Sequence, residues 1–285
     1  MTPTLVRQHL SPGGLGSRVD LCARARDWSE IQERMLVPLY EAAYRRLEVG
    51  TGTRLLGLGC GSGLALLLAA SRGAAVTGVE PSSPQRLALA RERLLPEAPG
   101  ARARAGTRLV DGAPKDAADA ETPAYTLVTA FEPIGCLAGD SEGLGELLEA
   151  ATPLAERGAP VVLAGWGPPE RCTTSSVLRV AAKLADPLRS TGSWRPALRD
   201  DLEEVAQRAG LKPDGSGRVA CPFGYAHMDS ALRGLLSTGL FDAAITATDQ
   251  AQVDKELTEA LHPYLRPDGT VWMPNVFRYL IARTP

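Results

Sequence analysis

Four glycines at alternate positions follow a short apolar run, and this pattern constrains the fold more than any other part of the chain. Residues 54–63 read Arg-Leu-Leu-Gly-Leu-Gly-Cys-Gly-Ser-Gly, and an apolar run over 64–70 follows at once. A strand, a glycine turn and a buried helix in this order open a nucleotide-binding α/β unit. Because glycine has no Cβ, such a turn lets the backbone approach a ligand closely.

The spacing of these glycines argues against two common nucleotide-binding signatures. A dinucleotide fingerprint needs G-x-G-x-x-G, and its last position would be Ser62, Leu64 or Leu66 in the three available registers. The phosphate loop G-x-x-x-x-G-K-[ST] is absent too, since no lysine lies near the turn. The turn therefore favours a ligand that joins a nucleoside to an amino acid and carries no phosphate.

Strands and helices are predicted to alternate after the turn. A short apolar strand over 76–80 ends in Glu80, and Ser83 followed by Pro84 is typical of the first turn of a helix, here expected over 85–95. Further predicted strands cover 108–112, 125–132, 158–166, 218–222 and, as the last antiparallel strand, 270–282. Further predicted helices cover 142–155, 173–184, 202–209, 230–237 and 250–265.

The segment 54–166 resembles the class I S-adenosylmethionine-dependent methyltransferases. Its glycine turn is similar to motif I of that family, and Glu80 stands at the family's acidic position after the second strand. The wider chain from Trp28 onward resembles small bacterial methyltransferases related to the ubiquinone and menaquinone methylating enzymes. The resemblance implies a Rossmann-like α/β fold, with a central, mostly parallel seven-stranded sheet flanked by helices. It also implies S-adenosyl-L-methionine as the cofactor and S-adenosyl-L-homocysteine as the product.

In such a fold the cofactor would lie along the carboxyl ends of the strands. The resemblance implies that Glu80 accepts hydrogen bonds from both ribose hydroxyls, for which a carboxylate offers two oxygens. It also implies that Asp111, after the third strand, contacts the adenine amino group. The expected cofactor-binding residues are Gly57, Gly59, Cys60, Gly61, Gly63, Glu80, Pro81, Asp111, Gly112, Phe131 and Glu132.

Two positions depart from the family pattern and leave a second function open. Gly57 stands where motif I has an aspartate, and Thr126 stands where an acid often occurs in strand four. Loss of the aspartate would lower cofactor affinity, unless Glu132 takes over the contact with the cofactor's amino group; a carboxylate facing water is the other interpretation of Glu132. The alternative function is a protein of this fold that catalyses a cyclisation or rearrangement, or has a regulatory role, without transferring a methyl group.

The substrate side is defined only by scattered aromatic residues and one histidine. Trp28, Tyr40, Trp166 and Tyr225 are candidate walls of an apolar pocket for a small organic acceptor, although a core position would explain each of them as well. His227 is the candidate base, because its unperturbed pKa suits proton transfer near neutrality; a purely structural histidine is the alternative. Methyl transfer can also proceed through positioning alone.

One domain is expected over 18–285, preceded by a flexible arm over 1–17. Within it, residues 18–49 would form a helical lid, with either a kink or a new helix at Pro38. Residues 50–170 would form the cofactor-binding core, and 171–285 the substrate-side half. That half carries a helical insertion over 223–269, before the last strand, which is a candidate roof over the substrate.

Composition excludes several classes of partner. With 31 basic and 33 acidic residues, the net charge of −2 offers no electrostatic footprint for nucleic acid or an anionic membrane. The apolar run 64–70 is too short to span a bilayer, and residues 1–17 lack the apolar core of a signal peptide. Five dispersed cysteines favour a reduced, cytoplasmic setting, and three scattered histidines predict no metal site. The oligomeric state stays open, a homo-oligomer included.

Overall fold

A central sheet organises the structure. The arm expected over 1–17 lies outside the residues that the computed structural model describes, which are 20–95, 106–118, 124–135, 141, 143–185 and 201–285. The seven strands, in the order β3-β2-β1-β4-β5-β9-β6, are β1 (Arg54–Leu58), β2 (Ala75–Val79), β3 (Thr107–Val110), β4 (Leu127–Ile134), β5 (Pro160–Trp166), β6 (Lys212–Ala220) and β9 (Val276–Arg283). β9 pairs antiparallel with both β5 and β6, and all the other pairings in this sheet are parallel. The predicted mostly parallel, seven-stranded α/β sheet is confirmed.

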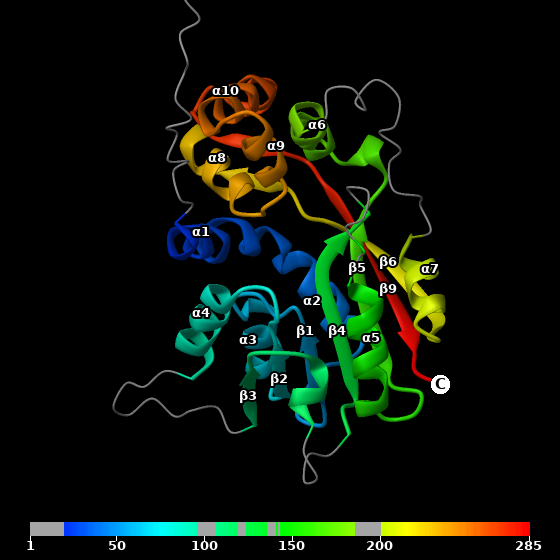
Figure 1. Cartoon of the computed structure of the whole chain (residues 1–285). Coiled ribbons are helices and arrows are strands. Elements are labelled where there is room, and N and C mark those ends of the chain that lie inside the picture. Colours follow the sequence, from blue (N-terminus) through cyan, green and yellow to red (C-terminus); the bar gives the residue numbers. More distant parts are fainter. Residues whose placement is uncertain (1–19, 96–105, 119–123, 136–140, 142, 186–200) are drawn as a thin grey trace, which may run out of the picture.

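Helices cover both faces of the sheet (Figure 1). In β1, Leu55 belongs to one apolar core and its neighbour Leu56 to the other, as the two-residue period of a strand requires. Residues of α2 and α3 join the first core, and residues of α5 and α7 join the second. The flanking helices are α2 (Val37–Arg46), α3 (Leu64–Ser71), α4 (Pro84–Leu94), α5 (Leu144–Ala151) and α7 (Asp201–Arg208).

Two facing glycines let α3 pack directly on the sheet. Gly57 of β1 lies opposite Gly78 of β2 in the parallel register. A Cβ on Gly57 would lie 2.9 Å from Leu66 Cδ2, and one on Gly78 would lie 2.5 Å from Leu66 Cδ1 and 2.8 Å from Cys60 Sγ. Leu66 and Cys60 therefore occupy the space that side chains at these two positions would need, so a larger residue at Gly57 would require Leu66 to move.

The N-terminal segment is helical but irregular. Helix α1 (Leu21–Asp27), capped by Asp20, leads into a π-helical turn over Trp28–Gln32 and a 3₁₀ turn over Glu33–Leu36. Helix α2 then begins at Val37 with Pro38 in its first turn, where proline costs no backbone hydrogen bond. The sequence predicts the break at Pro38, whereas the irregular stretch starts ten residues earlier, at Trp28. Such irregular turns are frequent at functional sites.

A helical cap lies at the end of the sheet where the parallel strands finish (Figure 1). It consists of α6 (Thr174–Ala185), α8 (Met228–Leu236), α9 (Asp242–Ala247), α10 (Gln250–Leu261) and a separate two-stranded ribbon of β7 (Phe223–Tyr225) and β8 (Val271–Met273). The expected insertion is present, with α9 as a helix that the sequence did not predict. Residues 271–273, expected in the last strand, pair with β7 instead.

The strand at one edge of the sheet is longer than its sequence predicts. The apolar pattern predicts a strand over 218–222, whereas β6 pairs with β9 from Lys212 to Ala220. The first half of β6 is polar and contains glycine, and its register shifts between Pro213 and Gly215. Backbone hydrogen bonds to β9 hold this edge strand in the sheet, so the strand forms without an alternating apolar pattern. Among the described residues, none of the helices combines the length and apolar character needed to cross a bilayer.

The close packing of Leu66 against β1 can be tested by giving Gly57 a methyl group. We expect Gly57→Ala to lower the free energy of unfolding by about 1–2 kcal/mol, because the new Cβ overpacks against Leu66. In a Leu66→Ala background the same change should cost almost nothing, since the clashing atoms are gone. Chemical denaturation measures both, with Gly52→Ala as the control because its Cβ would meet no atom within 4 Å. Equal costs in both backgrounds would contradict this account.

Candidate functional site

The glycine turn between β1 and α3 adopts a backbone that other residues rarely reach. Gly59, Gly61 and Gly63 have φ values of 58°, 56° and 79°, in the left-handed region that favours glycine. The turn is tied to the next strand, because Cys60 N donates to Val79 O at 3.0 Å. Glycine is thus required at these positions by the left-handed backbone. The absence of side chains there also leaves space above the turn.

Glu80, directly after β2, stabilises this turn through hydrogen bonds to its side chain. The residue is 2 % exposed. Its Oε2 accepts a hydrogen bond from Gly61 N at 2.8 Å, and its Oε1 accepts from Ser82 N at 3.0 Å and from the Ser82 hydroxyl. The carboxylate therefore fixes the turn through Gly61, and Glu80 is not among the residues that line the adjoining pocket.

A pocket lies over the glycine turn, between the ends of β1 and β4 and the N-terminal segment. The pocket is narrow: it leaves about 30 Å³ for the centre of a water-sized sphere, within about 470 Å³ of space between atoms that includes solvent at its mouth. Its walls combine apolar and aromatic side chains with two carboxylates and one guanidinium. The lining residues are Trp28, Glu33, Leu36, Tyr40, Gly57, Leu58, Gly59, Cys60, Gly61, Ala65, Leu66, Arg86, Thr129, Phe131 and Glu132.

A buried ion pair joins the N-terminal segment to the turn and to α4. Glu33 is 3 % exposed, and its Oε2 accepts from Arg93 Nη1 at 2.9 Å and from the Ser62 hydroxyl. Arg93 also donates to Ser62 O at 2.7 Å and to Ser29 Oγ at 2.6 Å. Four side chains from three separate parts of the chain thus satisfy one another, as buried charges require. This group, Ser29, Glu33, Ser62 and Arg93, is called the Glu33 cluster below.

Two aromatic side chains from the N-terminal segment enter the pocket. Tyr40 is 3 % exposed and its ring centroid lies 4.8 Å from that of Phe131. Burial, reinforced by the negative charge of nearby Glu33, raises the pKa of Tyr40 well above its usual value, so the hydroxyl stays protonated at ordinary pH. Trp28 lies under the guanidinium of Arg86, 4.2 Å from the ring centroid. Its buried Nε1 has no hydrogen-bond partner among the described residues.

The structure brings about half of the sequence-predicted site residues to this pocket. Those that line it are Trp28, Tyr40, Gly57, Gly59, Cys60, Gly61, Phe131 and Glu132. Gly63 faces α4 instead, with Ala90 Cβ 3.0 Å from where its own Cβ would be. Pro81 and Asp111 are exposed, and neither they nor Gly112 line the pocket.

The remaining substrate-side candidates lie elsewhere, which differs from the expectation. Trp166 packs in an aromatic cluster, with ring centroids 5.9 Å from Phe223 and 4.6 Å from Phe277. The Tyr225 hydroxyl donates to Gln32 Oε1 at 2.9 Å within the core.

His227 also lies outside the pocket. It is the exposed N-cap of α8, and its Nδ1 accepts from Ser230 N at 3.1 Å. That structural position gives no support to a role as the catalytic base.

Sequence reasoning missed Glu33 and Arg86, which both line the pocket. Glu33 carried a usable signal, because it lies three and seven positions before Leu36 and Tyr40 and so shares their apolar helical face. A charged residue on such a face is rarely buried without a partner. Arg86 carried no signal, because arginine in the first turn of a helix is ordinarily a surface residue. Among the described residues, no three His, Cys, Asp or Glu side chains are grouped so that they could hold a metal ion.

Comparison with solved structures identifies the fold. No protein-family model and no curated protein matches the sequence. The candidate methyltransferase BH2331 from Bacillus halodurans aligns with a TM-score of 0.52 at 14% identity, over 86% of this chain and 98% of its own. YcgJ from Bacillus subtilis aligns at 0.52 and 14%, over 89% and 99% of the two chains, and YjhP from Escherichia coli at 0.51 and 17%, over 91% and 98%. The chain has the Rossmann-like fold of the class I S-adenosylmethionine-dependent methyltransferases.

The Glu33 cluster should contribute to stability as a unit. We expect Arg93→Met to lower the free energy of unfolding by about 3 kcal/mol, because it leaves the Glu33 carboxylate buried without its cation. The double variant Glu33→Gln/Arg93→Met should be more stable than Arg93→Met alone, since no uncompensated charge remains. Denaturant unfolding measures these differences. Arg208→Met is the control, because its ion pair with Glu204 is exposed and should be worth less than about 1 kcal/mol. Additive effects of the two cluster substitutions would contradict this description.

Burial of Tyr40 predicts a loss of stability in alkali. Above about pH 10, the ordinary pKa of tyrosine, the unfolded chain releases the phenolic proton while the folded chain retains it. The unfolded state then binds fewer protons, so the free energy of unfolding falls as pH rises. Tyr40→Phe should remove about 1.4 kcal/mol per pH unit from this slope above pH 10 and leave the slope between pH 7 and 9 unchanged. Identical alkaline slopes in wild type and variant would show that Tyr40 titrates normally.

Proposed function

We propose that this chain binds S-adenosyl-L-methionine in the pocket over the glycine turn and transfers its methyl group to a small organic acceptor. One observation carries the proposal: a pocket lined by glycines, two carboxylates and aromatic rings lies at the carboxyl end of β1 and β4, where ligands bind in open α/β sheets. The methyltransferase-type fold supports the same conclusion.

The residues of the pocket suit this cofactor in their chemistry. Gly59 and Gly61 present backbone without side chains, and the unpartnered Trp28 Nε1 offers a buried donor to a ligand. Glu33, which is paired with Arg93, and Glu132 line the pocket together with Arg86. Carboxylates in the pocket wall suit a ligand with a sulfonium and an ammonium better than a phosphate-bearing nucleotide.

In the proposed reaction the protein acts mainly by positioning and by excluding water. When bound, S-adenosylmethionine supplies an activated methyl group on a positively charged sulfur. Phe131, Leu36 and Tyr40 are buried at the pocket wall and keep water from that centre. The Tyr40 hydroxyl, held protonated by its raised pKa, orients a bound group as a hydrogen-bond donor and does not act as a base. Positioning of this kind supplies up to about 7–11 kcal/mol of a reaction barrier.

Glu132 is proposed to contact the cofactor's amino group in place of the aspartate that motif I lacks. Its Oε2 lies 3.9 Å from the position of a Cβ on Gly59, so the carboxylate is beside the turn. The usual motif position cannot supply this contact, because Leu66 fills the space next to Gly57. We also propose that the protein acts in the cytoplasm on a small molecule, in keeping with its net charge of −2.

Calorimetric titration followed by a transfer assay tests this function. We expect the wild type to bind S-adenosylmethionine and S-adenosylhomocysteine and to move labelled methyl to at least one member of an acceptor panel. Glu132→Gln should weaken S-adenosylmethionine binding about tenfold, as loss of a charge-assisted hydrogen bond implies. Glu170→Gln, an exposed carboxylate outside the pocket, should not. Absence of binding would refute the proposal, and binding without transfer to any acceptor would favour the alternative of a non-methylating protein.

A further inference from the structure

Two polar atoms from the N-terminal segment face the same side of the glycine turn. Glu33 Oε1 and Trp28 Nε1 each lie 3.4 Å from the position that a Cβ on Gly61 would occupy. All three residues line the pocket. One atom is a hydrogen-bond acceptor and the other a donor, yet the structure contains no hydrogen bond between them, since Trp28 Nε1 has no partner among the described residues.

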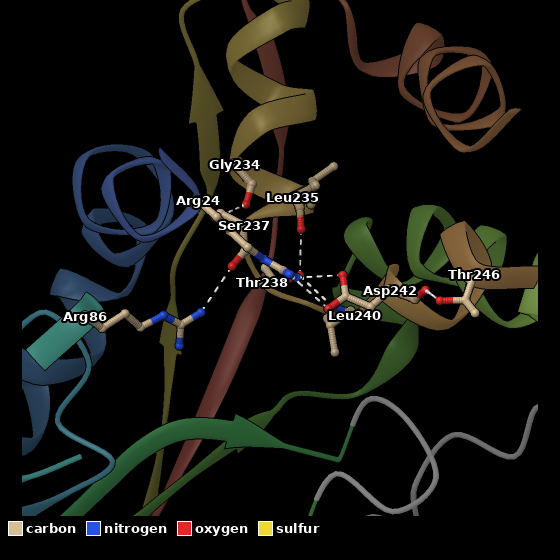
Figure 2. Close-up of polar contacts among 9 residues, drawn as sticks. All are labelled: Arg24, Arg86, Gly234, Leu235, Ser237, Thr238, Leu240, Asp242 and Thr246. Carbon is tan, nitrogen blue, oxygen red and sulfur yellow. Dashed lines mark hydrogen bonds and ion pairs between the residues drawn. The ribbon is translucent and has the colours of Figure 1, made fainter. Parts of the chain in front are cut away.

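The donor is held firmly in this position. The guanidinium of Arg86 stacks on the Trp28 ring at 4.2 Å, and Arg86 Nη2 in turn donates to Ser237 O at 3.1 Å. Figure 2 shows Arg86 reaching from α4 toward Ser237 at the end of α8, close to where Arg24 pairs with Asp242. The cap therefore fixes Arg86, and Arg86 fixes the indole. A buried N–H that is held in place without a partner is costly, unless a ligand accepts its hydrogen bond.

The acceptor has spare capacity on one of its two oxygens. Glu33 Oε2 is fully engaged by Ser62 and Arg93. Oε1 accepts only from Leu64 N at 3.3 Å, beyond the usual range for such a bond. A carboxylate oxygen has two lone pairs, so Oε1 can accept a further hydrogen bond from the pocket side. Its orientation is set by the rest of the Glu33 cluster, which leaves it little freedom to turn away.

A donor and an acceptor that face one point select the chemistry of the group between them. An ammonium group cannot accept from Trp28 Nε1. A carboxylate cannot donate to Glu33 Oε1 and would be repelled by its charge. A hydroxyl does both, because its oxygen accepts while its hydrogen donates. We propose that Trp28 Nε1 and Glu33 Oε1 together clamp one hydroxyl group of the bound ligand above Gly61.

On the proposed function, which this inference deepens, the clamped group is a ribose hydroxyl of the adenosyl moiety. This assignment adds a contact to the sequence expectation, in which Glu80 accepts hydrogen bonds from both hydroxyls. In the structure the Glu80 oxygens accept from Gly61 N and Ser82 N, and Glu80 does not line the pocket, whereas Trp28 and Glu33 do. In this proposal, residues of the N-terminal segment, which precedes the nucleotide-binding core in the sequence, form hydrogen bonds with a ribose hydroxyl.

The test removes the donor and the acceptor of the clamp separately. S-adenosylhomocysteine and its 2′-deoxy and 3′-deoxy analogues are titrated calorimetrically into wild type, Trp28→Phe and Glu33→Gln. Phenylalanine keeps a ring beneath Arg86 but has no N–H. We expect Trp28→Phe to weaken S-adenosylhomocysteine binding about fivefold. The analogue that lacks the clamped hydroxyl should bind wild type and Trp28→Phe equally, within twofold.

Two controls separate the clamp from folding and from cap docking. Thermal unfolding shows whether Glu33→Gln remains folded; because Glu33 also pairs with Arg93, Trp28→Phe is the primary variant. Arg24→Gln removes the cap contact to Asp242 without touching the pocket, and it should leave all three affinities unchanged.

Three outcomes would overturn the inference, and they are distinguishable. If Trp28→Phe weakens S-adenosylhomocysteine and both deoxy analogues equally, the indole acts by packing alone. If wild type binds both deoxy analogues as tightly as S-adenosylhomocysteine, the clamp holds only water. If wild type binds no S-adenosylhomocysteine at all, the proposed function fails and the sugar assignment falls with it.

Discussion

The buried pairing of Glu33 with Arg93 is the interaction on which the architecture of the site depends. Because neither charge is stable in the interior alone, the N-terminal segment, the glycine turn at Ser62 and helix α4 must come together for any of them to be satisfied. The pocket is lined by these three regions, which are distant in the sequence, and by a fourth, β4. The N-terminal segment that the sequence assigned to a helical lid contributes Trp28, Glu33 and Tyr40 to the pocket wall.

Sequence reasoning recovered the fold because the fold rests on local patterns. The strand, glycine turn and helix over 54–70 have a short-range signature, and the alternation that follows leaves few topologies. The site was recovered where it is made of backbone and strand ends, as at Gly59 and Phe131. It was missed where a side chain acts through a distant partner, as Glu33 does through Arg93, because no local pattern records which charges meet. At His227 the structure matches the structural alternative, since this side chain caps α8 and lies outside the pocket.

The cap and the pocket are physically continuous. Arg86 contacts the α8 end through Ser237 and the pocket through Trp28, while Tyr225 of β7 reaches Gln32 of the irregular N-terminal turn. Substitutions that break either of these two contacts can therefore alter the proposed ligand binding without touching the ligand. The glycine turn shows a similar dependence on other elements. Leu66 takes up the space next to Gly57, and the carboxylates beside the turn come from other elements, as Glu33 and Glu132 do.

The position of β9 has a consequence for how the molecule assembles. This strand, close to the end of the described chain, lies between β5 and β6 and is the only neighbour of β6 in the sheet. During synthesis, β6 emerges before the strand that will tether it, and β5 presents an unpaired edge until residues 276–283 have left the ribosome. Such an edge is a template for wrong pairing between chains. Completion of the sheet is thus a long-range event, because β5 and β6 are joined only through β9.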